Sequence, residues 1–331
     1  PGISSAASDV YKRQAVVDNS MHFDNPLDLD PDRVTWRRTL DVCDRQLRNC
    51  EAGLGSKFDG FPHSTGFDIV AASEVMTIMA LAKDMEDLRE RLGRIVVGYN
   101  RSGKPVFARE LNCIGSLCVI LKDALKPNLV QTTEHTPVMI HCGPFGNIAH
   151  GCNSVRATKM ALKLAPYVVT EAGFAADLGA EKFIHIKCRQ AGLNPNAAVL
   201  VATIRALKFH GGVEKENLGV ENVEALREGC QNLKTHAENV RKYGLPVVVA
   251  INRFPTDTDE ELETVRLFCE SIGVDCELSE VVARGGDGGT ELAKTVKRLV
   301  DETPGAASYL YDLEDNLKTC LLYTSDAADD I

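Results

Sequence analysis

The sequence predicts an α/β protein in which a mostly parallel sheet is flanked by helices. Two observations favour this fold class. Short apolar runs of strand length alternate with longer segments whose apolar residues recur at helical spacing, an alternation typical of parallel sheets covered by helices. The 331 residues are 44% hydrophobic and 25% charged, so the chain can bury a sizeable core in two domains or one large unit.

The expected strands are apolar runs rich in Val, Ile and Ala, and the expected helices lie between them. The last helix has the clearest start, because Asp257 or Thr258 can cap it and the acidic side chains of residues 259–261 complement its dipole. A glycine-rich loop follows at residues 285–289. We expect strands at residues 95–99, 138–141, 167–170, 198–204 and 246–251, and helices at residues 71–92, 154–164, 220–243 and 259–272.

The organisation of the chain is read from a polar segment and from its two ends. A boundary is expected near residues 132–136, which separates a region at residues 15–135 from a central region at residues 136–319. Residues 1–14 and 320–331 lack apolar periodicity and resemble translated adapter or vector sequence, so we exclude them from the fold. We interpret the chain as the middle portion of a longer protein, incomplete at both ends.

The composition excludes several classes of function. A net charge of -10 argues against a nucleic-acid-binding surface, and no run approaches the roughly 18 apolar residues that a membrane span needs. The eleven cysteines are scattered without a CxxC pair, which indicates reduced thiols in a cytoplasmic protein. Cys142 and Cys152 lie near His141 and His150, but their spacing fits no zinc pattern, so no metal site is predicted.

The string VATIRALKFHGG, residues 201–212, leads from an apolar strand pattern into cations and paired glycines. Such an end suits an anion, because glycine lets backbone N–H groups approach a ligand and Arg205 and Lys208 compensate its charge. An ordinary strand end with solvated charges is the alternative. Polar tails also follow the other expected strands, and parallel strands end on one edge of a sheet. We therefore expect one shared crevice lined by residues 141–147, 171–174, 205–212 and 252–255.

Several longer strings, read in order, resemble the formate–tetrahydrofolate ligase family. The resemblance covers about residues 15–319 and rests on several motifs rather than one. It implies a three-layer architecture like that of P-loop nucleotide hydrolases, substrates formate, ATP and tetrahydrofolate, a need for Mg²⁺, and homo-oligomers. The strings are VTWRR (34–38), FDIVAASEVM (67–76), ERLGRIVVGY (90–99), LKDALKPNLVQT (121–132), HCGPFGNIAHGCNS (141–154), VTEAGFAADLGAEKF (169–183), the one at 201–212 and INRFPTDTDEEL (251–262).

The family's reaction sets the chemistry expected of the crevice. ATP phosphorylates formate, and the folate N10 amine attacks the resulting formyl phosphate, so negative charge develops on oxygens that cations and backbone donors stabilise. Arg205 and Lys208 are the candidates for anion contact, with salt-bridged structural cations as the alternative. Glu171 is a candidate for orienting an amine or a water, against a helix-cap or surface role. His141 is a candidate proton shuttle, against a hydrogen-bonded structural histidine.

The resemblance also implies a folate site. Phe254, after Asn252, matches an aromatic residue that stacks on the folate ring in this family, against core packing as the alternative. Gly285 and Gly286 belong to the same site. The family's second aromatic residue, usually a Trp, corresponds to Val282, so we expect a lower affinity for the folate ring. Cys142 and Ala175 stand where the family usually has a small residue, often Gly.

The nucleotide site is the part that the motifs do not supply. The family's GEGKST-type phosphate loop has no match, and the string GYNRSGK at residues 98–104 is followed by Pro105 instead of Ser or Thr, so we expect a hairpin turn there. We place the phosphate loop upstream of Ala15 and expect no turnover from this chain alone. Two alternatives stay open, namely a noncatalytic folate- or nucleotide-binding remnant and another nucleotide-dependent α/β enzyme.

Overall fold

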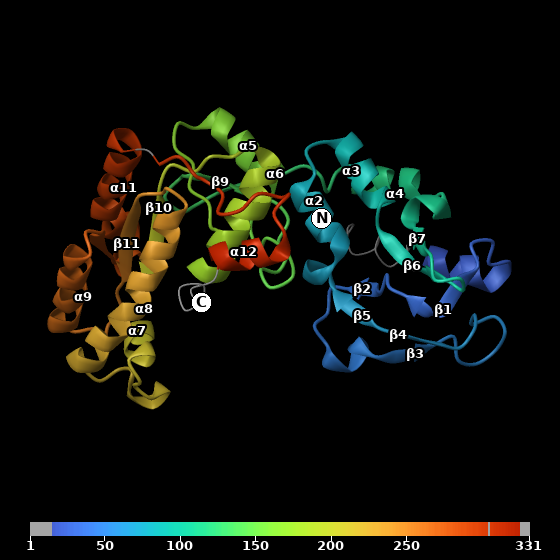
Figure 1. Cartoon of the computed structure of the whole chain (residues 1–331), viewed down its shortest axis with the longest axis horizontal. Coiled ribbons are helices and arrows are strands. Elements are labelled where there is room, and N and C mark those ends of the chain that lie inside the picture. The colour runs from blue at the N-terminus through green and yellow to red at the C-terminus, as the bar shows by residue number, and fades with distance from the viewer. Residues whose placement is uncertain (1–14, 304, 325–331) are drawn as a thin grey trace. The chain divides into compact units, whose positions relative to one another are not determined.

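The computed structural model describes residues 15–303 and 305–324 (Figure 1). The chain forms two compact units, residues 1–173 and residues 174–331, which we call unit 1 and unit 2. Together they form an α/β protein with several small sheets, in which parallel and antiparallel pairing are mixed. The expectation of a mostly parallel sheet therefore holds for unit 2 only.

Unit 1 is built around an antiparallel sheet in the order β1-β6-β7, covered by short helices. Its core includes Trp36, Leu88, Leu92, Val97 and Leu117, all buried. Its strands are β1 (Leu29–Val34), β2 (Arg38–Leu40), β3 (Cys50–Ala52), β4 (His63–Thr65), β5 (Phe67–Ile69), β6 (Val96–Asn100), β7 (Pro105–Phe107), β8 (Asn128–Gln131) and β9 (Pro137–Ile140). Its helices are η1 (Arg45–Arg48), η2 (Val70–Ala72), α2 (Glu74–Leu81), α3 (Met85–Gly93), η3 (Ala108–Leu111), α4 (Ile114–Leu121) and α5 (Val155–Leu164).

The expected helix at residues 71–92 is wrong as a single element. The chain forms α2 and α3 instead, because two capping side chains lie within the run. The hydroxyl of Ser73 accepts from the N–H of Met76, and the carboxylate of Asp84 accepts from the N–H of Asp87. Each cap starts a new helix, so the apolar periodicity continues across a break.

Two polar segments of unit 1 form hairpins. Residues 100–104 turn between β6 and β7, where the side chain of Asn100 accepts from the N–H of Lys104, so the predicted hairpin is confirmed. The segment at residues 132–136, where we expected a domain boundary, is the turn between β8 and β9. The expected strand at residues 167–170 does not form, and Val169 is 89% exposed. A strand needs a partner, and within the described residues none pairs with this segment.

Unit 2 contains a parallel sheet in the order β10-β11-β12 with an uninterrupted register. Its first two strands were expected and β12 was missed, while the strands expected at residues 95–99 and 138–141 form antiparallel pairs in unit 1. Helices α8 and α9 are crossover connections of this sheet and pack against each other on one face. Its strands are β10 (Ala198–Ala202), β11 (Val247–Asn252) and β12 (Asp275–Ser279). Its helices are η4 (Ala176–Ala180), η5 (Phe183–Cys188), α6 (Arg189–Ala191), α7 (Ile204–His210), η6 (Lys215–Asn217), α8 (Val223–Lys242), α9 (Asp259–Ser271), α10 (Val281–Arg284), η7 (Gly285–Gly289), α11 (Thr290–Glu302) and α12 (Leu317–Thr324).

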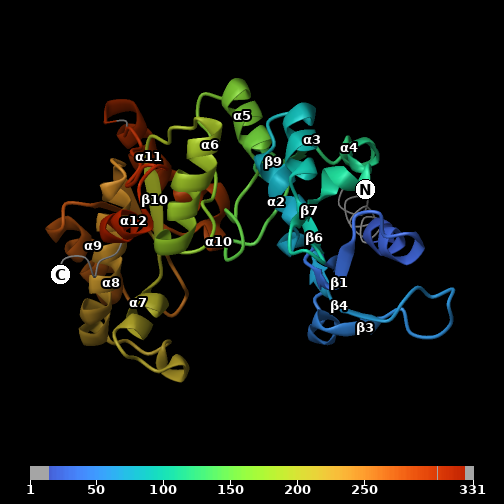
Figure 2. The ribbon, with the colours of Figure 1, turned by 45° about the vertical axis from the view of Figure 1, so that its right-hand side comes forward.

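The segment after β10 corrects a second expectation. The strand stops at Ala202, and the hydroxyl of Thr203 accepts from the N–H of Ala206, which starts helix α7. The cations expected on a strand tail therefore lie on a helix. Gly211 ends this helix where α7 and α8 lie side by side (Figures 1 and 2), and a Cβ there would meet the carbonyl oxygen of Ala225 at 1.8 Å. Gly211 thus allows close helix packing rather than anion contact.

Four other elements have nearly the limits that the sequence predicted. Strand β11 and helices α5, α8 and α9 begin and end within a few residues of their expected limits. Thr258 caps α9 in a capping box with Glu261, which confirms one of the two caps expected there. Helix α12 includes the first residues of the segment 320–331, and the expected foreign segment at residues 1–14 lies outside the described residues.

Candidate functional site

Polar side chains collect at the carboxyl edge of the parallel sheet in unit 2. Thr203 follows β10, Asn252 ends β11 and the segment Arg253 to Asp257 follows it, and Glu280 follows β12. Since parallel strands end on the same edge, the three loops lie beside one another. Side-chain contacts between the loops show that they do, and these contacts define the candidate site.

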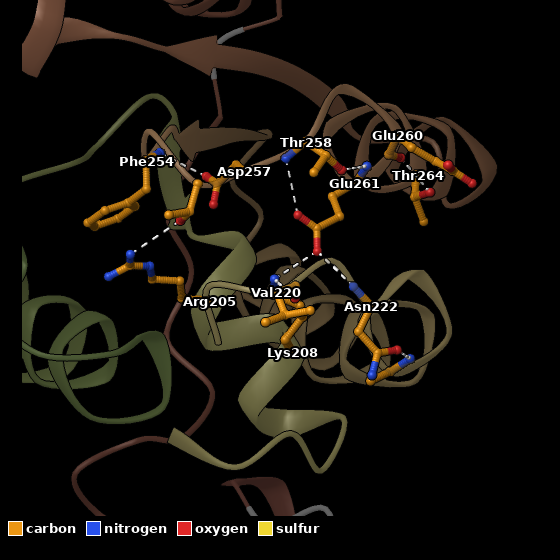
Figure 3. Close-up of polar contacts among 12 residues, drawn as sticks. Arg205, Lys208, Val220, Asn222, Phe254, Asp257, Thr258, Glu260, Glu261 and Thr264 are labelled. Carbon is orange, nitrogen blue, oxygen red and sulfur yellow. Dashed lines mark hydrogen bonds and ion pairs between the residues drawn. The ribbon is translucent and has the colours of Figure 1, made fainter. Parts of the chain in front are cut away.

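Arg205, on helix α7, contacts two residues of the loop after β11, Phe254 and Thr256. The guanidinium carbon of Arg205 lies 4.7 Å from the centre of the Phe254 ring, and its Nη2 donates to the hydroxyl of Thr256 at 3.2 Å (Figure 3). Its buried Nε has no hydrogen-bond partner among the described residues. Helix α7 thus holds a cation against an aromatic face with one donor unused.

The loop after β11 is a tight turn closed by Asp257. Its Oδ2 accepts from the N–H of Phe254 at 2.8 Å, and its own N–H donates to the carbonyl oxygen of Phe254 at 3.0 Å. Asp257 is 6% exposed, and its Oδ1 has no hydrogen-bond partner within the described part of the chain. A buried carboxylate oxygen without a donor is costly, so this atom marks a place where a ligand N–H would be stabilised.

Lys208 belongs to a buried network below this turn. Lys208 and Glu261 are both 0% exposed, and Nζ of Lys208 donates to Oε1 of Glu261 at 2.7 Å and to the carbonyl oxygen of Val220 at 2.9 Å (Figure 3). The carboxylate of Glu261 also accepts from the N–H groups of Asn222 and Thr258, at 3.1 and 3.2 Å. The network therefore ties α7 to the starts of α8 and α9. This geometry favours the structural alternative for Lys208 over direct anion contact.

The charge state of Glu261 follows from the same contacts. Burial opposes ionisation of this carboxyl, but the hydrogen bonds from Lys208, Asn222 and Thr258 outweigh it and lower its pKa. Both partners of the pair are then charged inside unit 2. A buried pair of this kind requires its geometry to be kept, because either charge alone would be uncompensated.

The loop after β12 is held by a second group of charges. The carboxylate of Glu280 accepts from Arg253 at 3.1 Å and from Arg284 at 3.0 Å, and these bonds, first that from Arg284, lower its pKa. Gly288 packs against this residue so closely that a Cβ would lie 2.5 Å from the carbonyl oxygen of Glu280. The segment that contains the predicted Gly285 and Gly286 is thereby fixed beside the site. Both of those glycines are exposed.

Val282, at the position of the family's second aromatic, stands in solvent. It is 86% exposed on the short helix α10. The structure therefore provides Phe254 as the aromatic face of this edge, and Asn252, at the end of β11, lies two residues from it. Sequence reasoning included Arg253 in the crevice lining without a role and missed Glu280 and Gly288, although Gly288 lies in the glycine-rich loop at residues 285–289.

His141 and Glu171 are in unit 1, whereas the contacts described above are all within unit 2. His141 is buried, with Nε2 2.7 Å from the carbonyl oxygen of Ala124 and Nδ1 2.6 Å from the hydroxyl of Ser154. Because a carbonyl only accepts, Nε2 carries the proton and Nδ1 accepts from Ser154. Burial, above all, lowers the pKa of His141. This geometry favours the structural alternative. Glu171 is exposed in the irregular segment before unit 2.

Two further features of unit 1 bear on the sequence expectations. Cys142 has a φ of 59°, a left-handed conformation that suits the glycine expected at this position, and burial raises the pKa of its thiol to about 12. All eleven cysteines of the chain are free thiols. Within residues 15–303 and 305–324, no three His, Cys, Asp or Glu side chains are grouped for a metal ion. Over the same residues, no helix is long and apolar enough to cross a membrane.

The fold and this edge define a class of protein, an α/β protein in which polar side chains gather at the carboxyl end of a parallel sheet. Residues 3–325 match the family model of formate–tetrahydrofolate ligase. The chain therefore belongs to the formate–tetrahydrofolate ligase family, as its motifs had indicated. The match spans nearly the whole chain and extends into both end segments that we had expected to be foreign.

Proposed function

We propose that this chain contributes to the ATP-dependent ligation of formate to tetrahydrofolate, which yields 10-formyltetrahydrofolate, ADP and phosphate through formyl phosphate, and that the chain alone gives no turnover, because the phosphate-loop motif of the family has no match in it. We further propose that the carboxyl edge of the sheet in unit 2 holds the folate. Family membership supports the reaction. The observation that supports the position of the folate is the half-buried ring of Phe254 beside Oδ1 of Asp257, which has no hydrogen-bond partner among the described residues. A pterin needs this combination, because it stacks through its face and donates hydrogen bonds through its edge.

Arg205 is the cation of the proposed site. It rests on Phe254 and holds one side-chain hydrogen bond, to Thr256, so little holds it in place. In the proposed complex the pterin takes this face of the ring. Arg205 then contacts the anionic oxygens of formyl phosphate and stabilises the charge that develops on them as the folate amine attacks.

The other candidate residues take supporting roles in this proposal. Lys208 acts as a positioning residue, because its buried bonds hold α7 and hence Arg205. Asn252, Gly285 and Gly286 line the folate side of the edge. His141 maintains the packing of unit 1 through both ring nitrogens. Glu171 keeps the role that the motif implies, orientation of an amine or a water.

ATP and Mg²⁺ enter the proposal through the family rather than through a site in the described residues. The string GYNRSGK forms a hairpin and does not fit a phosphate loop, so no step is assigned to it. The three-layer architecture, homo-oligomers and a cytoplasmic location are proposed on the same basis. A noncatalytic folate-binding role is the second candidate, favoured by the exposed Val282 in place of an aromatic partner.

The test is tetrahydrofolate binding to the purified chain, measured by titration calorimetry. We expect Phe254→Ala to weaken binding by about 10- to 100-fold, because it removes about 1.5–3 kcal/mol of stacking and apolar burial. Phe254→Tyr keeps the ring and should bind like the wild type. Phe209→Ala, which removes an exposed ring from α7, is the matched control.

Two outcomes would count against the proposal. If Phe254→Ala and the wild type bind tetrahydrofolate with equal affinity, the folate does not bind at this edge. Formation of ADP and 10-formyltetrahydrofolate by the purified chain alone would contradict the absence of turnover that the proposal includes.

A further inference from the structure

A cavity of about 430 Å³ in unit 1 is lined by residues of the helical segment 15–23, of β2 and of the loop that joins β3 to β4 (Figure 1). Its volume is in the range of small-molecule sites. Its lining includes charged, aromatic and histidine side chains, among them Asp18, Arg38, Lys57, Phe58, Phe61 and His63. The proposed function does not use this cavity.

His63 contributes a buried ring nitrogen to the lining. Its side chain is 6% exposed, and its Nδ1 lies 3.0 Å from the carbonyl oxygen of Phe61. Because a carbonyl only accepts, Nδ1 carries the proton, which leaves Nε2 as an acceptor in the neutral ring. Nε2 has no hydrogen-bond partner among the described residues. A buried acceptor without a donor is costly, so a ligand N–H at this atom would be stabilised.

Arg38 supplies the complementary group, a donor. Its Nη2 donates to Oδ2 of Asp18, and its guanidinium carbon lies 5.9 Å from the centre of the Phe67 ring. Its Nη1 is buried and has no hydrogen-bond partner in the part of the chain that the structure describes. Oδ1 of Asp18 lies 3.7 Å from Nε2 of His63, so the unused donor and the unused acceptor flank one carboxylate.

The charges that line the cavity cancel. The guanidinium of Arg38 is neutralised by Asp18, and the ammonium group of Lys57 is accompanied by the carboxylate of Asp59 on the same loop. Asp59 is ionised, since hydrogen bonds from the N–H and the hydroxyl of Ser56 lower its pKa. Two cations and two anions leave no net charge, which favours an uncharged ligand over an anion.

Aromatic side chains of the loop favour a planar ligand. Phe58 is 86% exposed, and Phe61 lies beside the ring of His63 with 4.8 Å between the ring centres. The loop is closed by the bonds of Asp59 and by Gly53, at which a Cβ would lie 2.0 Å from the carbonyl oxygen of Phe61. The backbone that carries both phenylalanines is thereby fixed beside the cavity, and a flat molecule can stack on their rings.

We propose that this cavity binds a small, uncharged, planar heterocycle through a lactam edge, that is, a ring carbonyl beside a ring N–H. The carbonyl oxygen accepts from Nη1 of Arg38, and the N–H donates to Nε2 of His63. A heterocycle that lacks either group leaves a buried partner unsatisfied, so the edge selects the ligand. The rings of Phe58 and Phe61 contact the faces of the bound heterocycle.

Titration calorimetry of the purified chain with hypoxanthine tests this site, because this purine carries such an edge and no net charge at neutral pH. We expect a dissociation constant of about 0.1–1 mM, in keeping with the size of the ligand. 1-Methylhypoxanthine, in which a methyl group replaces the N–H of the edge, should bind about tenfold more weakly. Benzoate, a planar anion, should bind more weakly than hypoxanthine, because the charges of the cavity cancel.

Variants locate the bound purine. His63→Phe should weaken hypoxanthine binding about tenfold and remove the difference between the two purines, and Phe58→Ala should weaken it about threefold. Leu54→Ala changes an exposed apolar residue of the same loop outside the cavity lining, so it is the matched control and should bind like the wild type. Phe254→Ala should also leave the affinity unchanged, because its ring belongs to the candidate folate site in unit 2.

Several results would overturn the proposal. They are the absence of hypoxanthine binding, equal affinity of the wild type for the two purines, and tighter binding of benzoate. Loss of binding in Phe254→Ala but not in Phe58→Ala would place hypoxanthine at the edge of the sheet in unit 2 and would overturn it as well. Phe58 is exposed, so this comparison holds even if His63→Phe does not fold.

Discussion

Arg205 and Lys208 lie one turn apart on α7, yet burial gives them different roles. Arg205 is half-buried and rests on Phe254, with an unused donor, so it can respond to a ligand. Lys208 is buried, and its ammonium group donates hydrogen bonds to the carboxylate of Glu261 and the carbonyl oxygen of Val220. A cation that is fully buried and fully bonded stabilises the native arrangement only while its partner stays charged.

The pair makes a prediction about stability. Lys208→Ala should destabilise unit 2 by about 3–5 kcal/mol, because it leaves the buried carboxylate of Glu261 uncompensated. The double variant Lys208→Met with Glu261→Met should lose less, since no charge stays buried. Urea unfolding of the wild type, Lys208→Met, Glu261→Met and the double variant measures the coupling. Additive losses would show that the two side chains act independently.

His185 is a buried titratable group outside the candidate site. Its ring stacks on Tyr311 at 4.3 Å, and its Nε2 has no hydrogen-bond partner among the described residues. Burial and then the charge of Arg189 lower its pKa from 6.5 to about 4. The folded chain therefore keeps this ring neutral at a pH where the unfolded chain protonates it.

A pH dependence of stability follows. Between about pH 6.5 and 4 the unfolded state binds the extra proton, so stability falls as the pH falls through this window, by at most about 3 kcal/mol. Above pH 6.5 this contribution is constant. Thermal melts at pH 7 and pH 4.5 test it, and His185→Phe should reduce the difference between them. An unchanged difference in the variant would assign the effect to other groups, such as His141.

The close packing of helices α7 and α8 requires glycine at two positions. A Cβ at Gly229 on α8 would lie 1.8 Å from the carbonyl oxygen of Leu207 on α7. Gly211 makes the reciprocal approach from the end of α7. The two helices pack through backbone at these points, and this packing orients the helix that carries Arg205.

Substitution of one glycine tests this element pair. Gly229→Ala should destabilise the chain by about 1–3 kcal/mol, because the added methyl overlaps backbone even though alanine is the better helix former. Gly115→Ala, on α4, is the control, since nothing lies within 4 Å of its would-be Cβ, and it should stabilise by up to about 1 kcal/mol. Urea unfolding measures both. A stabilised Gly229→Ala would refute the close approach.

On the scale of the whole molecule, the chain consists of two compact units joined near residue 173. The connecting segment, residues 165–173, has no regular secondary structure, and Phe174 after it is exposed. Backbone of this kind can adapt to a protease, whereas the strands of each unit cannot. The division into units is therefore open to a direct test.

Limited digestion with chymotrypsin should cut early after two exposed aromatic residues, Phe58 and Phe174. The cut after Phe174 should release residues 175–331, together with residues 1–174 or, where Phe58 is also cut, residues 59–174, and mass spectrometry identifies these fragments. Phe174→Ala should abolish these fragments and leave the cut after Phe58. Early cuts inside β11 or α8 would contradict the division.

Much of the fold could be predicted because it is encoded locally. Strand β11 is a continuous apolar run, and α9 carries its own cap and acidic first turn, so neither needs distant residues to be recognised. The break between α2 and α3 was missed because an apolar period runs across it. The segment 167–170 has strand-like composition, but a strand exists only where another strand pairs with it.

By itself, the sequence determined the family, the strands β10 and β11 of the parallel sheet in unit 2, and the position of Arg205, Asn252 and Phe254 at one edge. Each of these depends on motifs or on spacing between near neighbours. Only the tertiary structure decided that α7 replaces a strand tail, that Asp257 keeps an unpartnered oxygen, and that Lys208 is buried. Burial depends on residues far apart in the chain, and Glu261 stands 53 positions from the lysine that it neutralises.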